Sequence, residues 1–254
     1  MRTRVGVFQE GDSPGKETTM EPKYKRILLK LSGEALAAGG EGIINDEFVS
    51  RVAAALSRCL AAGVEIGVIV GAGNIWRGRQ GVGMDRTRGD YMGMLATAIN
   101  ALALSDAFIR EGIDTRVMCA IQMPEIGEYY TRDAAVAHLA AGRVVIFAGG
   151  LGRPYFSTDT AGALRAVEIG ADAVLMAKNI DGVYTADPKT DPTAKKLESI
   201  TYGEILTKGL RVIDSTAAAL SNDNRMPTLV FGLDDPDNIY RAVMGEKLGT
   251  VITA

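Results

Sequence analysis

The 254-residue sequence predicts an α/β fold, a single αβα sandwich with a mostly parallel central sheet. Two observations lead to this prediction: short apolar runs alternate with helical patterns from residue 26 onward, and glycines cluster where several of the runs end. Parallel strands need crossover connections, and crossovers place helices on both faces of the sheet. No change of composition divides residues 26–254, so we expect one domain there.

Each expected strand is an apolar run bounded by glycine or polar residues, and each expected helix carries apolar residues at helical spacing. In the helix over 45–63, Asn45 or Asp46 is the expected N-cap and Gly63 the expected C-cap. The predicted strands are 27–31, 64–70, 115–120, 143–148, 172–177, 227–231 and 249–253. The predicted helices are 45–63, 90–110, 133–142, 159–169, 215–220 and 236–245.

Residues 1–23 differ from the rest of the chain. They are polar, contain two prolines and show no periodicity, which predicts a flexible N-terminal extension. The run GDSPGKE resembles a phosphate-binding loop, but it has three residues instead of four between its glycines and ends in Glu17. Met20 stands directly before the first regular pattern and is an expected translation start.

Composition narrows the function classes. The net charge of −3 does not favour nucleic-acid binding, and no apolar run reaches the roughly 18 residues of a membrane span. Cys59 and Cys119 lie far apart in apolar runs, which favours a reduced, cytoplasmic protein. The single histidine, His138, excludes a multi-histidine metal site and is expected to be structural. Chemistry must then rely on lysine, arginine, aspartate and backbone amides.

Three glycine-rich loops follow predicted strands, at 32–36, 71–78 and 148–154. Loops at the carboxyl ends of parallel strands meet at one edge of the sheet, where backbone N–H groups can bind anionic oxygens. Basic residues accompany these loops, namely Lys30, Arg77, Arg79 and Arg153. Glycines that merely permit tight turns are the alternative interpretation.

The second loop does not fit a dinucleotide-binding fingerprint. Gly71-Ala72-Gly73 would need glycine or alanine at position 76, where the chain has Trp76. A nicotinamide-dependent enzyme is therefore disfavoured, and phosphate binding must use another arrangement.

Several segments resemble the bacterial uridylate kinases, which are UMP kinases of the amino-acid kinase fold. The similar segments are 23–36, 71–78, 88–104, 154–172, 179–195 and 243–253. Lys-x-Ser-Gly and Asp-Gly-Val-Tyr are shared with other kinases of that fold, whereas GDYMGMLAT and VMGEKLGT are more specific to the uridylate kinases. The resemblance implies a nucleotide kinase domain over residues 24–254, ATP and UMP as substrates, and ATP-bound Mg²⁺ as cofactor.

The resemblance also assigns site residues. It implies an ATP site formed by Lys30, Leu31, Ser32, Gly33, Gly73, Arg77, Lys178, Asn179, Tyr184 and Asp187. It implies a UMP site formed by Ala72, Asp90, Leu151, Gly152, Arg153, Pro154, Tyr155, Phe156, Ser157 and Thr158. The expected catalytic residues are Lys30, Arg77 and Asp159, and side chains are not expected to supply a metal site of their own.

These assignments agree with the chemistry of phosphoryl transfer. The phosphate of UMP is already anionic, so no strong general base is needed and catalysis depends on positioning and charge neutralisation. We expect Lys30 to stabilise the transition state and Asp159 to orient lysines; the alternative for Asp159 is a helix N-cap. Lys178 is either an ATP-side lysine or a solvated strand end. Asp90 is either a ligand of the ribose hydroxyls or a helix N-cap.

Three departures from the family pattern are visible, and in one of them Met176 and Lys178 replace a more usual Lys-Ala-Thr run. Leu151 stands where the family often has threonine, and residues 38–46 only partly match a loop that binds GTP in some members. GTP activation and UTP inhibition are therefore open, and a homohexamer is implied by the resemblance. The rival interpretations are a kinase of the same fold acting on a carboxylate such as acetylglutamate, and a nucleotide sensor without catalysis.

Overall fold

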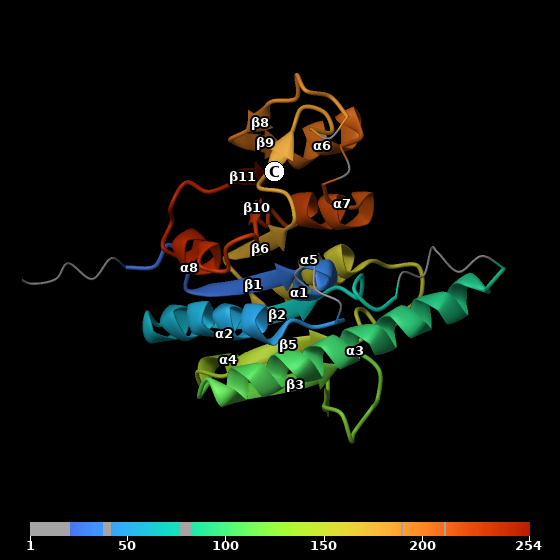
Figure 1. Cartoon of the computed structure of the whole chain (residues 1–254), viewed down its shortest axis with the longest axis vertical. Helices are drawn as coiled ribbons and strands as arrows, with labels where there is room; N and C mark the ends of the chain where they lie inside the picture. Colours follow the sequence, from blue (N-terminus) through green and yellow to red (C-terminus); the bar gives the residue numbers. More distant parts are fainter. Residues whose placement is uncertain (1–20, 38–41, 77–82, 189, 211) are drawn as a thin grey trace, which may run out of the picture.

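The computed structural model describes residues 21–37, 42–76, 83–188, 190–210 and 212–254 (Figure 1). The extension up to Met20, the predicted catalytic Arg77 and the neighbouring Arg79 lie outside the described residues, so the expectations for them remain predictions.

Within the described residues, a nine-stranded sheet forms the centre of the molecule, in the order β4-β3-β5-β2-β1-β6-β10-β11-β9. All neighbouring strands pair in parallel except β10 and β11, which are antiparallel. The strands are β1 Arg26–Leu31, β2 Glu65–Val70, β3 Thr115–Cys119, β4 Glu128–Tyr129, β5 Val144–Ala148, β6 Ala173–Lys178, β9 Ser199–Thr201, β10 Thr228–Gly232 and β11 Thr250–Thr253. The short strands β7 Val183–Tyr184 and β8 Lys196–Leu197 pair separately.

Helices cover both faces of this sheet. Alternate strand residues face opposite sides, so the core divides into two apolar layers. One layer contains residues of α2 and α3, which lie side by side in Figure 1, and of α8; the other contains residues of α4, α5, α6 and α7. The helices are α1 Gly33–Ala37, α2 Asp46–Ala61, α3 Arg86–Arg110, α4 Arg132–Ala140, α5 Thr158–Ile169, α6 Tyr202–Lys208, α7 Ser215–Asp223 and α8 Asn238–Val243. The predicted αβα sandwich is confirmed.

The structure corrects three predicted helix ends. The helix α2 ends at Ala61 with Ala62 as C-cap, and the expected C-cap Gly63 follows it with a φ of 84°. The helix α3 begins one turn before Asp90, because the side chain of Asp85 accepts from Arg88 N and caps it. The helix α5 is capped by Ser157. The alternative interpretation of Asp90 and Asp159 as helix N-caps is therefore wrong.

The loops that follow β1 and β2 touch each other directly. A Cβ atom at Gly33 would lie 2.3 Å from the carbonyl oxygen of Gly71 and 2.7 Å from the nitrogen of Gly73. Only glycine allows this approach of two backbones. The N–H of Gly71 donates to the carbonyl of Leu31 over 3.0 Å. The two loops thus form one continuous surface at the carboxyl edge of the sheet.

Candidate active site

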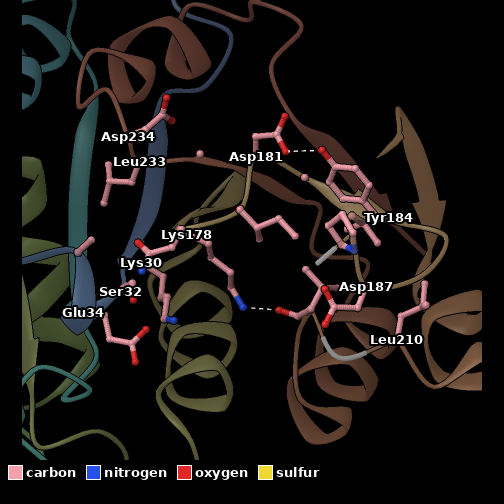
Figure 2. A pocket seen from close by; sticks show the side chains of 18 of the residues that line it. Lys30, Ser32, Glu34, Lys178, Asp181, Tyr184, Asp187, Leu210, Leu233 and Asp234 are labelled. Atoms are coloured by element: carbon pink, nitrogen blue, oxygen red, sulfur yellow. Dashed lines mark hydrogen bonds between the residues drawn. The ribbon is translucent and has the colours of Figure 1, made fainter. Parts of the chain in front are cut away.

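A cavity of about 1350 Å³ opens at the carboxyl ends of β1, β6 and β10 (Figure 2). Ligand sites of open α/β sheets lie at this edge. Six residues predicted for the ATP site line the cavity: Lys30, Ser32, Lys178, Asn179, Tyr184 and Asp187. Leu31 is instead fully buried in the core.

Two lysines that line this cavity, Lys30 and Lys178, share the carboxylate of Asp159. Nζ of Lys30, at the end of β1, lies 2.9 Å from Oδ1 of Asp159, and Nζ of Lys178, at the end of β6, lies 3.3 Å from Oδ2. Lys178 also donates to the carbonyl of Val212. Figure 2 shows Lys30 and Lys178 side by side in the cavity wall. The alternative of a solvated Lys178 is wrong, because only 18% of its side chain is exposed.

Burial and charge act together on these groups. Burial opposes ionisation of Asp159, but the ammonium groups of Lys30 and Lys178 outweigh it and hold the pKa of the carboxyl below its ordinary value. Burial lowers the pKa of Lys178, against the attraction of Asp159. One carboxylate therefore holds two ammonium groups of neighbouring strands in the wall of the cavity, an arrangement suited to neutralising an anionic ligand.

Asp214 connects the starts of α5 and α7, and the sequence analysis did not predict this role. Its carboxylate accepts from the hydroxyl of Ser157, the N-cap of α5, and from that of Thr160 in α5 at 3.0 Å, and it caps α7 through Ala217 N. A cap for α7 could have been expected from the aspartate before the STAAAL pattern. The contacts with α5 lie more than 50 residues away in sequence, and no local pattern indicates them.

Asp90 lies in the second turn of α3 and joins it to the loop 151–157. Both carboxylate oxygens accept from Nε of Arg86, at 2.9 and 2.8 Å, and Oδ2 also accepts from the N–H of Tyr155 at 2.8 Å. The guanidinium of Arg86 stands 5.4 Å from the centre of the Tyr155 ring. We call the group formed by Arg86, Asp90 and Tyr155 the acceptor corner.

The loop that carries Tyr155 is held in an unusual conformation. Tyr155 has a φ of 71°, which is uncommon for a residue with a side chain, and its ring is 68% exposed. Phe156 is also exposed. Gly152, with a φ of 69°, approaches the carbonyl of Ala120 so closely that a Cβ would lie 2.7 Å from it. This loop thus presents two aromatic rings to solvent next to Asp90.

The remaining predicted residues occupy the same edge of the sheet. Leu151 is half-buried against the apolar layer of α5, and Arg153 donates to the carbonyl of Gly152. A Cβ at Gly71 would lie 3.6 Å from Oγ1 of Thr158, so the loops after β2 and β5 approach each other. The residues Ala72, Gly73 and Pro154 belong to these two loops and are half-buried.

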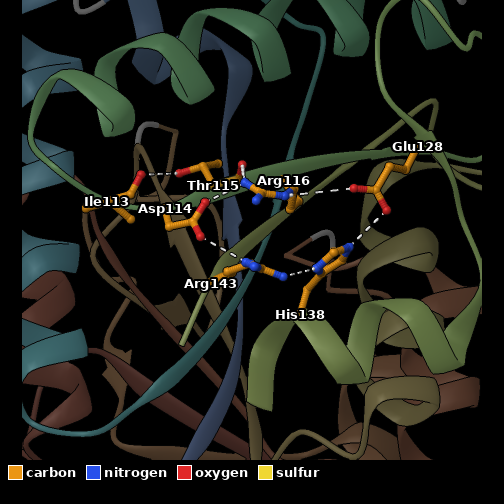
Figure 3. A network of polar contacts seen from close by, with 7 residues as sticks. All are labelled: Ile113, Asp114, Thr115, Arg116, Glu128, His138 and Arg143. Carbon is orange, nitrogen blue, oxygen red and sulfur yellow. Dashed lines mark hydrogen bonds and ion pairs between the residues drawn. The ribbon is translucent and has the colours of Figure 1, made fainter. Parts of the chain in front are cut away.

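His138 takes part in a separate polar network (Figure 3). Its Nε2 lies 2.9 Å from Glu128, and its Nδ1 lies 3.1 Å from a guanidinium nitrogen of Arg143, which also donates to Asp114. Asp114 and Arg143 precede β3 and β5, so the network belongs to the edge opposite the cavity. This position agrees with the structural role expected for His138.

The fold is matched by a known family of kinases. A model of the amino acid kinase family matches residues 25–232, and the chain belongs to this family.

The solved structures that resemble this chain include UMP kinases of three organisms. The chain is 37% identical to a UMP kinase from Bacillus anthracis, with a TM-score of 0.87 and coverage of 91% of this chain and 96% of that one. It is 35% identical to a UMP kinase from Ureaplasma parvum, with a TM-score of 0.85 and coverage of 91% and 99%. A uridylate kinase from Archaeoglobus fulgidus is 30% identical, with a TM-score of 0.67 and coverage of 89% and 99%.

Proposed function

We propose that this chain is a UMP kinase, which transfers the γ-phosphoryl group of ATP to UMP and yields UDP and ADP in pyrimidine nucleotide synthesis. The observation that carries the proposal is the position of Asp159. It pairs with Lys30 and Lys178, which line the cavity, and it lies two residues after the loop 151–157, which carries Tyr155 of the acceptor corner. The similarity to UMP kinases over about nine-tenths of the chain supports the same function.

The cavity is the proposed ATP site. Lys30 and Lys178 would contact the oxygens of the transferred phosphoryl group. The same cavity is also lined by Asn179, Tyr184 and Asp187. The acceptor corner is the proposed UMP site, where Asp90 would accept from ribose hydroxyls. In this arrangement the start of α5 stands between the donor and the acceptor.

The transfer itself needs little from the protein beyond position and charge. An anionic oxygen of the UMP phosphate attacks the γ-phosphorus, a new P–O bond forms, and the bond to the oxygen that bridges the β- and γ-phosphates breaks, leaving ADP. The two ammonium groups stabilise the charge that spreads over the equatorial oxygens. Because the attacking oxygen is already deprotonated, no histidine or other base is required.

Mg²⁺ is the proposed companion of ATP, and when bound it neutralises charge on the phosphate oxygens. The donors present fit an ion held mainly by those oxygens. Asp159 is already paired with two lysines, and among the described residues no group of three or more histidine, cysteine or acidic side chains could hold a metal. Removal of divalent ions with a chelator is expected to abolish transfer.

We further propose that the chain assembles with copies of itself through α3. The outer face of this 25-residue helix exposes an apolar stripe. The stripe consists of Tyr91, Met92, Leu95, Ile99, Leu102 and Ile109. The helix α3 is also long and apolar enough to cross a membrane, but half of its most apolar stretch of 18 residues is buried inside the fold. Light scattering of Leu95→Lys should show a smaller assembly than the wild type; a monomeric wild type would contradict the proposal.

The finer expectations remain proposals. A homohexamer, activation by GTP, inhibition by UTP and a cytoplasmic location follow from the family resemblance, and the free, buried Cys59 and Cys119 suit a reducing compartment. An assay of UDP formation with and without GTP or UTP tests the regulators.

The direct test of the proposed function is formation of ADP and UDP from ATP and UMP by the purified full chain. A carboxylate kinase of the same fold is the second candidate, because the lysine-aspartate centre alone does not choose the acceptor. The two are separated by offering UMP and acetylglutamate to the same preparation.

A further inference from the structure

Asn100 is a polar residue in the middle of α3 that is completely buried. Its side-chain amide donates to the carbonyl of Gly71 and to Oδ1 of Asn74, both at 2.8 Å. The amide of Asn74 donates back to Oδ1 of Asn100 at 2.9 Å and also to the carbonyl of Ile43. A buried amide is stable only when its hydrogen bonds are satisfied, and here both amide hydrogens and the oxygen of Asn100 have partners.

These bonds fix the direction of one peptide group in the loop after β2. In a planar trans peptide the C=O and the N–H point in opposite directions. Because the carbonyl of Gly71 is held toward α3, the N–H of Ala72 in the same peptide points away from α3. Within the part of the chain that the structure describes, neither Ala72 N–H nor Gly73 N–H has a hydrogen-bond partner.

The free amides lie where the proposed substrates would meet. Gly33 of the loop after Lys30 approaches the nitrogen of Gly73, and Thr158, the residue before Asp159, approaches Gly71. A backbone N–H at this place can donate to a phosphate oxygen at no cost in side-chain ordering.

A second residue of α3 holds the neighbouring glycine loop in a related way. The hydroxyl of Thr97, one turn before Asn100, accepts from Gly149 N at 2.9 Å and donates to the carbonyl of Met94. Buried side chains of α3 therefore form hydrogen bonds with the loops after β2 and β5. Of the two contacts, the one made by Asn100 sets the direction of an unpaired N–H.

We propose that Asn100 is a positioning residue for phosphoryl transfer, which aims the N–H of Ala72 at a phosphate oxygen by holding the carbonyl of Gly71. The inference rests on the proposed function. Asn100 does not touch the substrate; it acts through the loop. Its loss is expected to turn the peptide and to lower the rate of transfer more than the affinity for either nucleotide, since small displacements of a binding group cost up to about 100-fold in rate.

The test compares Asn100→Leu with a control at the same helix, Leu104→Ala. Leucine has nearly the shape of asparagine but neither donates nor accepts, whereas Leu104 is a fully buried apolar residue one turn later in α3. We expect Asn100→Leu to lower kcat by about 10-fold to 100-fold, with each KM changed by less than about threefold. Leu104→Ala should lose stability and keep its kcat. Equal kcat in the two variants would overturn the proposal.

Asn74→Ala keeps the test decisive if Asn100→Leu does not fold, because Asn74 lies in a half-buried loop. It should lower kcat in the same direction with an unfolding midpoint near that of the wild type, and an unchanged kcat would contradict the proposal. Combined with Asn100→Leu, it should add little further loss, because both changes break one amide pair. Independent, multiplicative losses would show that the two residues do not act together.

Amide hydrogen exchange separates this inference from the proposed function. Exchange in the peptide spanning residues 70–76 should be faster in Asn100→Leu than in Leu104→Ala. If the wild type makes no UDP, the proposed function fails, while faster exchange would still show that Asn100 holds the loop. If UDP is made and exchange in the loop is equal in the two variants, the inference fails alone.

Discussion

The ammonium nitrogen of Lys30 lies 2.9 Å from Oδ1 of Asp159, although the two residues come from a central strand and a covering helix. Lys178 contacts the other oxygen of the same carboxylate. The contact joins the end of β1 to the first turn of α5, the helix that follows the loop 151–157 with Tyr155 of the acceptor corner. The proposed donor and acceptor sites are therefore linked through one ion pair.

Lys30→Ala should remain folded and lower kcat by about 100-fold or more, because an ammonium group aimed at developing charge contributes most in the transition state. Steady-state kinetics with ATP and UMP measure the change. Lys25→Ala is the matched control, since it removes the same charge from an exposed position just before β1. A folded Lys30→Ala enzyme with the kcat of the control would remove Lys30 from the catalytic role.

Asp159→Asn should destabilise the protein at neutral pH by about 3 kcal/mol, because it leaves two buried ammonium groups without their carboxylate. The pKa of Asp159 is lowered in the folded state, so its stabilising contribution is present above the ordinary value of 3.8 and is lost as the pH falls through the lower, folded value. Urea unfolding of both proteins between pH 2 and 7 measures this. A difference in stability that stays constant down to pH 2 would contradict the assignment.

Lys178 should make kcat fall on the alkaline side of its pH profile, and at a lower pH than a free lysine would. Burial lowers its pKa below the ordinary 10.5, so the ammonium group loses its proton, and with it the positive charge, at a lower pH than a free lysine does. We expect kcat to fall below pH 10.5, and Lys178→Arg to shift that limb upward because a guanidinium stays charged. A profile of kcat against pH for both enzymes decides the point. An identical alkaline limb would assign it to another group.

Asp90→Asn should raise the KM for UMP by about 10-fold and leave the KM for ATP nearly unchanged, because hydrogen bonds to a charged acceptor contribute more than those to a neutral one. Asp85→Asn serves as control: it changes the true N-cap of α3 to another good capping residue and removes the same charge. Should both KM values stay at the wild-type level, Asp90 only pairs with Arg86 and Tyr155.

Local patterns in the sequence predict most of the fold. Apolar runs locate β1, β2 and β5 to within about a residue, because buried parallel strands are continuously hydrophobic. The start of α3 was misplaced because Asp85 and Asp90 both suit a helix start, and only the folded chain shows which one caps. The two-residue strands β7 and β8 are too short to carry a period.

The site is predictable in part. Lys30, Asp159 and Asp90 stand next to glycine loops or at expected element ends, so sequence and family resemblance indicate them together. The roles of Asp214 and Asn100 depend on hydrogen bonds to residues far away in sequence, and such contacts leave no local signal. The pairing of Arg86 with Asp90 could have been expected from their spacing of four within a helix, had the helix been extended to Asp85.

The most direct test of the proposed function is an ATP-dependent phosphorylation assay of the purified chain with UMP, CMP, dTMP and acetylglutamate offered separately. We expect that UMP is the preferred acceptor, that UDP and ADP form in equal amounts, and that Lys30→Ala loses this activity. Phosphorylation of acetylglutamate without phosphorylation of UMP would contradict the proposed function.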